Sequence, residues 1–172
     1  MKNLYILFTI LAGLILAPAC KKEKHKKSKV QMERGDGAAA AADAGALFDA
    51  IIAGHNNNVQ DILNDHPGLV GARNEDEDTP LIVASKYDNP DIVQELLDKG
   101  ADVNATNRRG QTALILASRD GLENVIDTLL DVQGIRIDAV NGFGNSALIV
   151  ASERGFPNIV EKLIHKGADV NI

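Results

Sequence analysis

The side chains that could bind a transition metal are few and unsuitably spaced. The chain has four histidines and one cysteine. No two histidines are four residues apart, and none neighbours the cysteine, so the ligand spacing of a zinc site is missing. We therefore expect no metal site. The residues concerned are His25, His55, His66, His165 and Cys20.

A run of four acidic residues, Glu-Asp-Glu-Asp at 75–78, could offer oxygen ligands to calcium. The run lacks the central glycine and the downstream bidentate glutamate of an EF-hand loop. It directly precedes Thr79, where carboxylates would favour the start of a helix. We interpret the run as a solvated turn, with a weak cation site as the alternative.

Three serines could be nucleophiles, but their placement argues against catalysis. Ser85, Ser118 and Ser152 each end a recurring seven-residue string, with no histidine in register. A nucleophilic serine needs a neighbouring base, so packing between helices is the better interpretation. The Gly-Phe-Gly at 142–144 has no strand and helix around it to bind phosphate. We expect no catalytic residues and no cofactor.

The recurring string is the strongest pattern in the chain. It reads Thr-Pro-Leu-Ile-Val-Ala-Ser at 79–85, Thr-Ala-Leu-Ile-Leu-Ala-Ser at 112–118 and Ser-Ala-Leu-Ile-Val-Ala-Ser at 146–152. The spacings, 33 and then 34 residues, are typical of a solenoid, in which each unit packs on its neighbours.

Each unit contains signals for two helices. A hydroxyl residue begins the string and can cap a first helix, and Pro80 suits the first helical turn. Apolar pairs four residues apart then predict a longer second helix with one apolar stripe. Gly100, Gly134 and Gly167 follow this stripe, where a left-handed residue ends a helix.

Together these motifs resemble the ankyrin repeat, over about residues 43–172. The matching residues are the Thr-Pro-Leu of 79–81, the Gly-Ala-Asp-Val-Asn of 100–104 and 167–171, and the Gly-x-Thr/Ser of 110–112 and 144–146. The resemblance implies an all-α solenoid of about four helix-turn-helix units linked by hairpin turns. The units would span about 43–74, which is degenerate, then 75–107, 108–141 and 142–172.

The resemblance also implies where a protein partner would bind. In such repeats, the hairpin tips and the exposed side of the first helices form a concave face. Arginine and tyrosine are frequent in binding hot spots, and a phenylalanine at a turn is unexpected for a solvated tip. The candidate partner-binding residues are Lys86, Tyr87, Arg108, Arg109, Arg119, Phe143 and Arg154.

Charge divides the chain into two parts. From Ala44 onward there are 10 Lys+Arg and 20 Asp+Glu, a net charge of −10, whereas residues 21–34 carry seven basic and two acidic side chains, a net charge of +5. The acidic part lacks the basic footprint that phosphates require, so nucleic acid is not an expected partner.

The first 19 residues are typical of a signal peptide. Lys2 precedes a largely apolar run over 4–17, which is shorter than the roughly 20 residues of a spanning helix. The run leads into Ala-Pro-Ala-Cys at 17–20, which resembles a bacterial lipoprotein signal. Cleavage before Cys20 with lipid attachment is our main expectation. Secretion after an Ala-x-Ala site and an uncleaved anchor are the alternatives.

The expected domains are therefore a signal peptide over 1–19, a lipidated Cys20 with a flexible tether over 20–46, and the repeats over 47–172. The lysines of the tether would be a solvated spacer or would contact anionic lipid headgroups. This predicts an exported, membrane-anchored protein on the periplasmic side or outer surface of a bacterial envelope. We expect a non-enzymatic module that binds another protein. The alternative is a structural envelope protein that self-associates through its C-terminal repeat.

Overall fold

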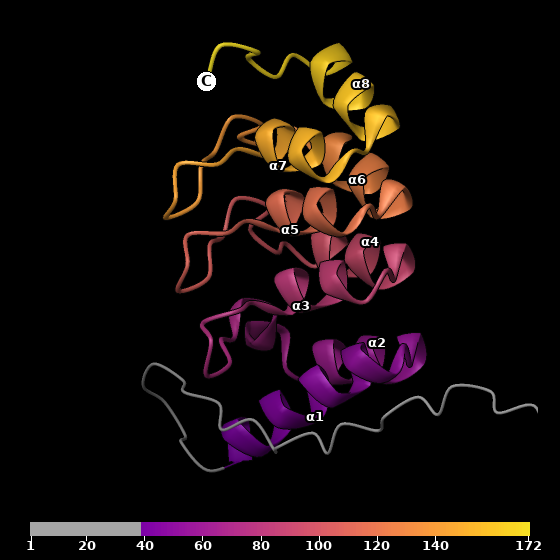
Figure 1. Ribbon diagram of the computed structural model, residues 1–172. Coiled ribbons are helices and arrows are strands. Elements are labelled where there is room, and N and C mark those ends of the chain that lie inside the picture. Colours follow the sequence, from indigo (N-terminus) through magenta and orange to yellow (C-terminus); the bar gives the residue numbers. More distant parts are fainter. Residues whose placement is uncertain (1–38) are drawn as a thin grey trace, which may run out of the picture.

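The computed structural model describes residues 39–172 as eight α-helices and one short 3-10 helix, with no β-strand in that range. The helices form stacked antiparallel pairs, and a hairpin loop projects from the stack between successive pairs (Figure 1). The predicted all-α solenoid is confirmed. The elements are α1 Ala39–Ala53, α2 Asn56–Asp65, η1 Pro67–Gly71, α3 Pro80–Lys86, α4 Pro90–Asp98, α5 Ala113–Asp120, α6 Glu123–Leu130, α7 Ala147–Arg154 and α8 Pro157–His165.

The predicted helix caps are present in all three clear units. The side-chain oxygen of Thr79 accepts a hydrogen bond from the backbone N–H of Ile82 at 3.3 Å. Thr112 and Ser146 make the same bond three residues ahead, each at 3.3 Å. Each bond satisfies an amide that would otherwise lack a partner at the start of the helix. These caps fix where each first helix begins, and therefore where the preceding hairpin must end.

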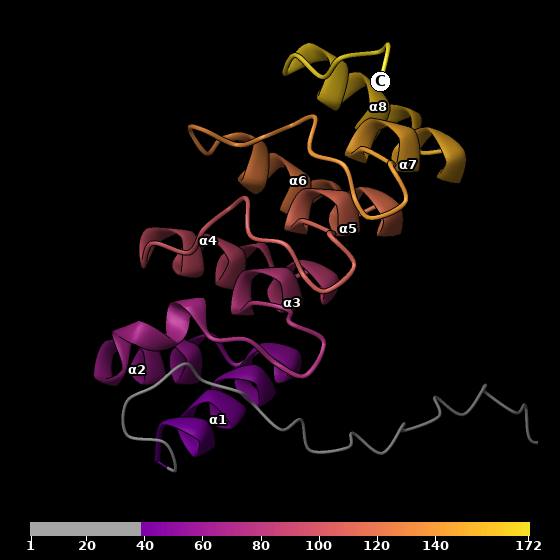
Figure 2. The same cartoon turned by 90° about the vertical axis from the view of Figure 1, so that its left-hand side faces the viewer.

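The helices lie in two layers. The first helices α1, α3, α5 and α7 contact one another in succession, and α2, α4 and α6 do the same in the second layer. Figure 2 shows α3, α5 and α7 stepping past one another beside α4 and α6. The space between the layers is filled by small and aliphatic side chains such as Leu96, Leu116 and Ile126, all 0–1% exposed. Stability therefore comes from interfaces between neighbouring units.

The boundary of the repeat domain differs from the one expected. The tether was expected to extend over 20–46, but α1 begins at Ala39. Ala44 and Leu47 are fully buried, so the helix is packed before residue 47 is reached. Alanine has the highest helix propensity, so an alanine-rich segment leading into a packed helix continues that helix. The signal peptide over 1–19, Cys20 and the tether over 20–38 lie outside the described residues.

The second helices are joined by polar contacts between neighbouring units. Lys162 donates to Asp127 at 2.7 Å, and Lys166 donates to Asp131 at 2.8 Å. These pairs are exposed and each contributes little on its own. Both pairs have a spacing of 35 residues and join the α8 segment to the α6 segment. Lys99 likewise donates to Asn64 at 2.6 Å.

Two of the three repeated serines have packing roles, and they supply a matched test. Ser85 and Ser118 are both fully buried, whereas Ser152 is exposed. The Ser85 hydroxyl donates to the carbonyl of Leu81 at 2.8 Å, but the Ser118 hydroxyl has no hydrogen-bond partner among residues 39–172. The two positions are equivalent in fold and differ in this bond.

We expect Ser118→Ala to leave the free energy of unfolding unchanged or to raise it by up to about 1 kcal/mol, because it removes an unsatisfied buried hydroxyl. Ser85→Ala is expected to lower it by about 1 kcal/mol, because a made hydrogen bond is lost. Urea unfolding followed by circular dichroism measures both. Equal losses for the two variants would contradict this assignment.

Candidate functional site

Three hairpin tips line one edge of the stack, and each is closed by an asparagine. The side-chain oxygen of Asn107 accepts from the backbone N–H groups of Arg109 and Gln111, both at 3.0 Å. Asn141 accepts from the N–H groups two and four residues ahead at 2.9 and 3.1 Å, and Asn74 does so at 3.0 and 2.9 Å. The asparagine fixes the path of each turn, so the tips are held in a defined shape.

The tips are also bonded to one another. The backbone N–H of Arg108 donates to the carbonyl of Asp76 at 3.2 Å, and the N–H of Gly142 donates to the carbonyl of Arg109 at 2.9 Å. These bonds join the first tip to the second and the second to the third. A side chain carried by one tip therefore keeps its position relative to the next, which favours a preformed binding surface.

A buried carboxylate lies beneath the first two tips. Asp78 is only 2% exposed, and its Oδ1 accepts from the side-chain amide of Asn107 at 2.9 Å. Its other oxygen pairs with the ammonium group of Lys86. The interpretation of 75–78 as a solvated turn is therefore wrong for Asp78. Asn107 is only 9% exposed because it takes part in this network.

Three of the candidate cations are held by partners within the chain. Lys86 pairs with Asp78, as described. Arg108 donates to the carbonyl of Glu75 at 2.6 Å and lies 3.9 Å from the carboxylate of Glu77. Arg119 donates to both oxygens of Asp120, at 2.8 and 2.7 Å. A partner would have to compete with these contacts. We therefore expect the three cations to contribute less to the affinity for a partner than unpaired cations would.

The fork of Arg119 on Asp120 has an electrostatic consequence. The hydrogen bonds that Arg119 donates to Asp120 raise the pKa of the Arg119 guanidinium, burial opposes that rise, and the negative charge of Asp120 adds to it. Arg119 therefore stays cationic at every physiological pH, as arginine does elsewhere. Its charge is compensated locally by Asp120, and the pair presents little net charge to a partner.

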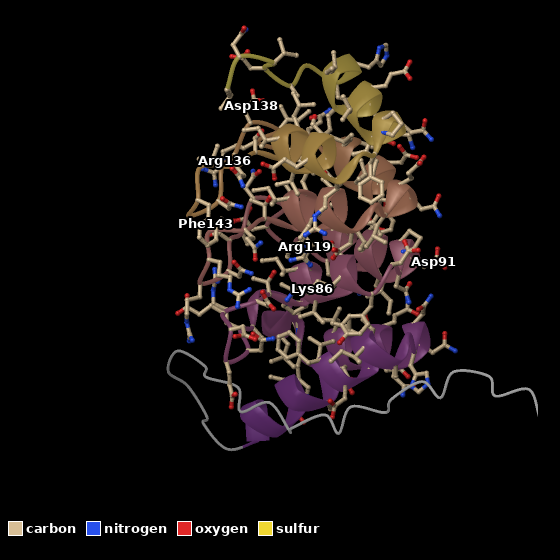
Figure 3. The ribbon with its side chains drawn as sticks, in the orientation of Figure 1. Lys86, Asp91, Arg119, Arg136, Asp138 and Phe143 are labelled. Atoms are coloured by element: carbon tan, nitrogen blue, oxygen red, sulfur yellow. The ribbon has the colours of Figure 1, made fainter. Side chains whose placement is uncertain are left out.

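The four remaining candidates are free to meet a partner. Phe143 is 80% exposed and Tyr87 is 47% exposed. The exposed side chains of Arg109 and Arg154 make no hydrogen bond or ion pair within residues 39–172. In Figure 3, Phe143 lies at the hairpin edge, Lys86 and Arg119 lie over the first helices, and Asp91 points away on the other side. We call the surface formed by Tyr87, Arg109, Phe143 and Arg154 the hairpin face.

The described residues contain no cluster of metal-binding side chains. Over 39–172, no three histidine, cysteine, aspartate or glutamate side chains are placed to hold a metal ion. In the same range, no helix has the length and apolar character needed to span a bilayer. What the geometry provides is a surface with two exposed aromatic rings, Tyr87 and Phe143, and two uncompensated cations, Arg109 and Arg154.

Comparisons with known proteins identify the repeat. The family model described as "Ankyrin repeats (3 copies)" matches residues 19–107, 37–141 and 102–172. Together these matches cover most of the chain.

Similar proteins include serine/threonine-protein kinase VIK of Arabidopsis thaliana, which is 39% identical over 47% of this chain and 19% of its own length. The human NAD-capped RNA hydrolase NUDT12 is 36% identical over 42% of this chain and 16% of its own length. The nuclear factor NF-kappa-B p105 subunit of Rattus norvegicus is 33% identical over 59% of this chain and 10% of its own length. The chain thus spans less than a fifth of each of these relatives.

Proposed function

Because this chain belongs to the ankyrin-repeat family, whose repeats typically bind protein partners, we propose that it is a non-enzymatic module that presents its hairpin face to a protein in a bacterial cell envelope. The observation that carries the proposal is Phe143, 80% exposed on a hairpin tip bonded to the neighbouring tip. An aromatic ring left in water on a rigid support costs hydrophobic free energy that a partner would recover.

The charges of the hairpin face suggest the chemistry of the partner. Arg109 lies one hairpin away from Phe143, and the Gly142–Arg109 backbone bond fixes the distance between their tips. An uncompensated guanidinium favours a carboxylate, and the exposed ring favours an apolar group. We propose that the partner offers an acidic residue beside an apolar one.

The position in the envelope rests on the amino-terminal residues. The apolar run over 4–17 and the single cysteine at 20 support export and lipid attachment at Cys20. A lipid chain with neighbouring lysines would give a two-part membrane anchor, since one acyl chain alone binds weakly and reversibly. Salt-dependent binding of a peptide covering 21–34 to anionic liposomes would test the contribution of the lysines. Binding that does not change with ionic strength would contradict a contribution of the lysines.

We expect combined Tyr87→Ala, Arg109→Ala and Phe143→Ala to reduce recovery of crosslinked partners at least tenfold, because two aromatic contacts and one charged contact are lost together. The measurement is crosslinking in cells followed by mass spectrometry. Helical circular dichroism should be unchanged, because the three side chains are exposed. Asp91→Ala, on the opposite side of the molecule (Figure 3), is the matched control and should retain the crosslinks.

The same experiment with Cys20→Ser separates anchoring from binding. Loss of the membrane fraction with retained partner binding in extracts supports both parts of the proposal. Retained membrane association of Cys20→Ser would contradict lipid attachment at Cys20. Unchanged crosslinks in the triple variant would contradict partner binding at the hairpin face. The alternative, a self-associating structural protein, requires oligomers that grow with concentration in light scattering. A strict monomer would exclude it.

A further inference from the structure

The residue two places after the asparagine of each hairpin occupies the same position in all three tips. The backbone N–H groups of Asp76, Arg109 and Phe143 each donate to the side-chain oxygen of that asparagine, at 3.0, 3.0 and 2.9 Å. The carbonyls of Asp76 and Arg109 each accept a hydrogen bond from the next tip, at 3.2 and 2.9 Å. Because the same bonds recur, the three residues form a row of nearly equal steps along the hairpin edge of the stack (Figure 1). We call Asp76, Arg109 and Phe143 the tip row.

All three members of the tip row are exposed to solvent. Asp76 and Arg109 are exposed although another hairpin is bonded to each of their tips. Exposure at this position is therefore a property of the tip, and it does not depend on whether a further hairpin follows. The same argument applies to Phe143, which is 80% exposed.

The three side chains of the tip row differ in chemistry. Within residues 39–172, neither the Asp76 carboxylate nor the Arg109 guanidinium makes a hydrogen bond or an ion pair. The neighbouring Arg108 is different, because it donates to the carbonyl of Glu75 and lies near the carboxylate of Glu77. The tip row therefore presents an anion, a cation and an aromatic ring, in that order from the first hairpin to the third.

The step between the tips limits the shape of a partner that could contact all three. Packed helices lie about 8–10 Å apart, so the tips that they carry advance by about the same step. A polyproline II segment has three residues per turn and rises about 3.1 Å per residue, so residues three apart lie on one side of it, about 9 Å from each other. In a β-strand, residues three apart are about 10 Å from each other but point to opposite faces. A polyproline II segment therefore matches the tip row, and a β-strand does not.

We propose that the tip row binds a linear segment of the partner protein in the polyproline II conformation, with a basic, an acidic and an apolar residue at intervals of three. The basic residue pairs with Asp76, the acidic residue pairs with Arg109, and the apolar residue covers the ring of Phe143. The acidic residue is the central one, because Arg109 is carried by the central tip.

This inference rests on the function proposed above, since Arg109 and Phe143 belong to the hairpin face. It adds a contact at Asp76, the order of the three groups and the distance between them. Charge alone would let any acidic and apolar surface bind. The order of the tip row makes a narrower prediction, because a segment with the same three residues in another order would place like charges together or leave the ring uncovered.

The test uses the full chain and six heptapeptides of one composition. Each carries lysine, glutamate and leucine at its first, fourth and seventh positions in a different order, with proline between them to hold the polyproline II conformation. Acetylated and amidated ends remove the terminal charges. Fluorescence anisotropy at low salt, with the same label on every peptide, measures the Kd values.

Two of the six peptides have glutamate in the centre, and they differ in chain direction. We expect the tighter of these two to bind at least fivefold more tightly than each of the four peptides with lysine or leucine in the centre. Because all six share one composition, non-specific attraction to charged parts of the chain, including the lysines of 21–34, affects them alike.

Exchanging the two charges of the tip row is the matched control. Asp76→Arg combined with Arg109→Asp keeps the composition and the net charge of the protein, and it places the anion on the central tip. The preference should then move, by a similar factor, to a peptide with lysine in the centre. Circular dichroism and urea unfolding should be unchanged, because both side chains are exposed and the turn bonds of these residues come from their backbones.

Equal Kd values for the six peptides, or no binding at millimolar peptide, would overturn the proposal. A preference that stays the same in the exchanged variant would overturn it too, since the tip row would not be its source. These failures differ from failure of the proposed function. If the six peptides bind equally while the triple variant at Tyr87, Arg109 and Phe143 loses its crosslinks in cells, the hairpin face binds a partner of another shape. If the order preference is found but those crosslinks are unchanged, the tip row recognises the segment and the proposed cellular function of the hairpin face is wrong.

Discussion

Replacing Gly121 by alanine should lower the free energy of unfolding by about 3 kcal/mol, from two causes that can be separated. A non-glycine residue at φ +77 costs about 1–2 kcal/mol. The new Cβ would also lie 2.7 Å from the ring of Phe156, which must move and lose packing against the third unit, for a further 1–2 kcal/mol or so. Urea unfolding of the full chain measures the sum.

Gly155→Ala is the matched control, because Gly155 is the equivalent residue one unit later. Its φ is +74 and its Cβ position is open, so only the cost of the left-handed backbone, about 1–2 kcal/mol, is expected. The difference between the two variants reports the packing of Phe156. Adding Phe156→Ala to Gly121→Ala should cost less than Phe156→Ala alone, since the two residues share one contact. Equal losses for Gly121→Ala and Gly155→Ala would show that Phe156 adapts freely.

The repeat pattern predicted the parts of the fold that depend on local chemistry. A hydroxyl residue before an apolar string predicts a capped helix, and Thr79, Thr112 and Ser146 make those bonds. The recurrence at 33 and 34 residues predicted that the units stack in register. The first unit was found from the same register, although the recurring seven-residue string is absent from it. Periodicity therefore identified units whose individual residues had diverged.

The candidate site was predictable only in outline. The register showed which residues lie near the hairpins, but not which of their polar groups bond to each other. Lys86 and Arg108 are held by acceptors that only folding brings close, at Asp78 and Glu75. Arg119 is held by its sequence neighbour Asp120, but the sequence does not show that this pair forms. Asparagines at 74, 107 and 141 follow the 33- and 34-residue spacing and could have revealed the closed turns. The start of α1 was missed because an alanine run carries helix propensity without apolar periodicity.

Hairpin residues with a positive φ show a related limit of prediction from the sequence. In the hairpins, Gly110 and Gly144 have φ of +71 and +81, and Glu77 holds the same place in the first hairpin at φ +61. Residue type alone predicts the left-handed backbone at the two glycines but not at the glutamate. The first hairpin keeps the turn because Asn74 and the contacts around Asp78 specify it without the help of glycine. That difference makes the first hairpin the most dependent of the three on its buried network.

Asp78→Ala is therefore expected to lower the free energy of unfolding by about 2–3 kcal/mol. The substitution removes the nearer of the two acceptors of the buried Asn107 amide, at 2.9 Å, and leaves only the bond to Gln111 at 3.3 Å. Water cannot replace the lost bond without entering the network. It also removes the partner of Lys86. Because Lys86 is 31% exposed, its ammonium group can turn to water, so that part of the loss is small. Urea unfolding of the full chain measures the total.

Two further variants separate the contributions of the Asn107 hydrogen bond and the Lys86 ion pair to this loss of stability. Asp78→Asn keeps an acceptor for Asn107 but removes the charge, so it should cost only about 1 kcal/mol. Lys86→Met removes the cation and leaves the carboxylate unpaired at a site that is 2% exposed, which should cost more than Asp78→Asn. If the hydrogen bond to Asn107 holds the tips together, Asp78→Ala should weaken partner binding at the hairpin face while Asp78→Asn preserves it. An Asp78→Ala protein as stable as the parent would show that the hairpins are fixed by their asparagines and backbone bonds alone.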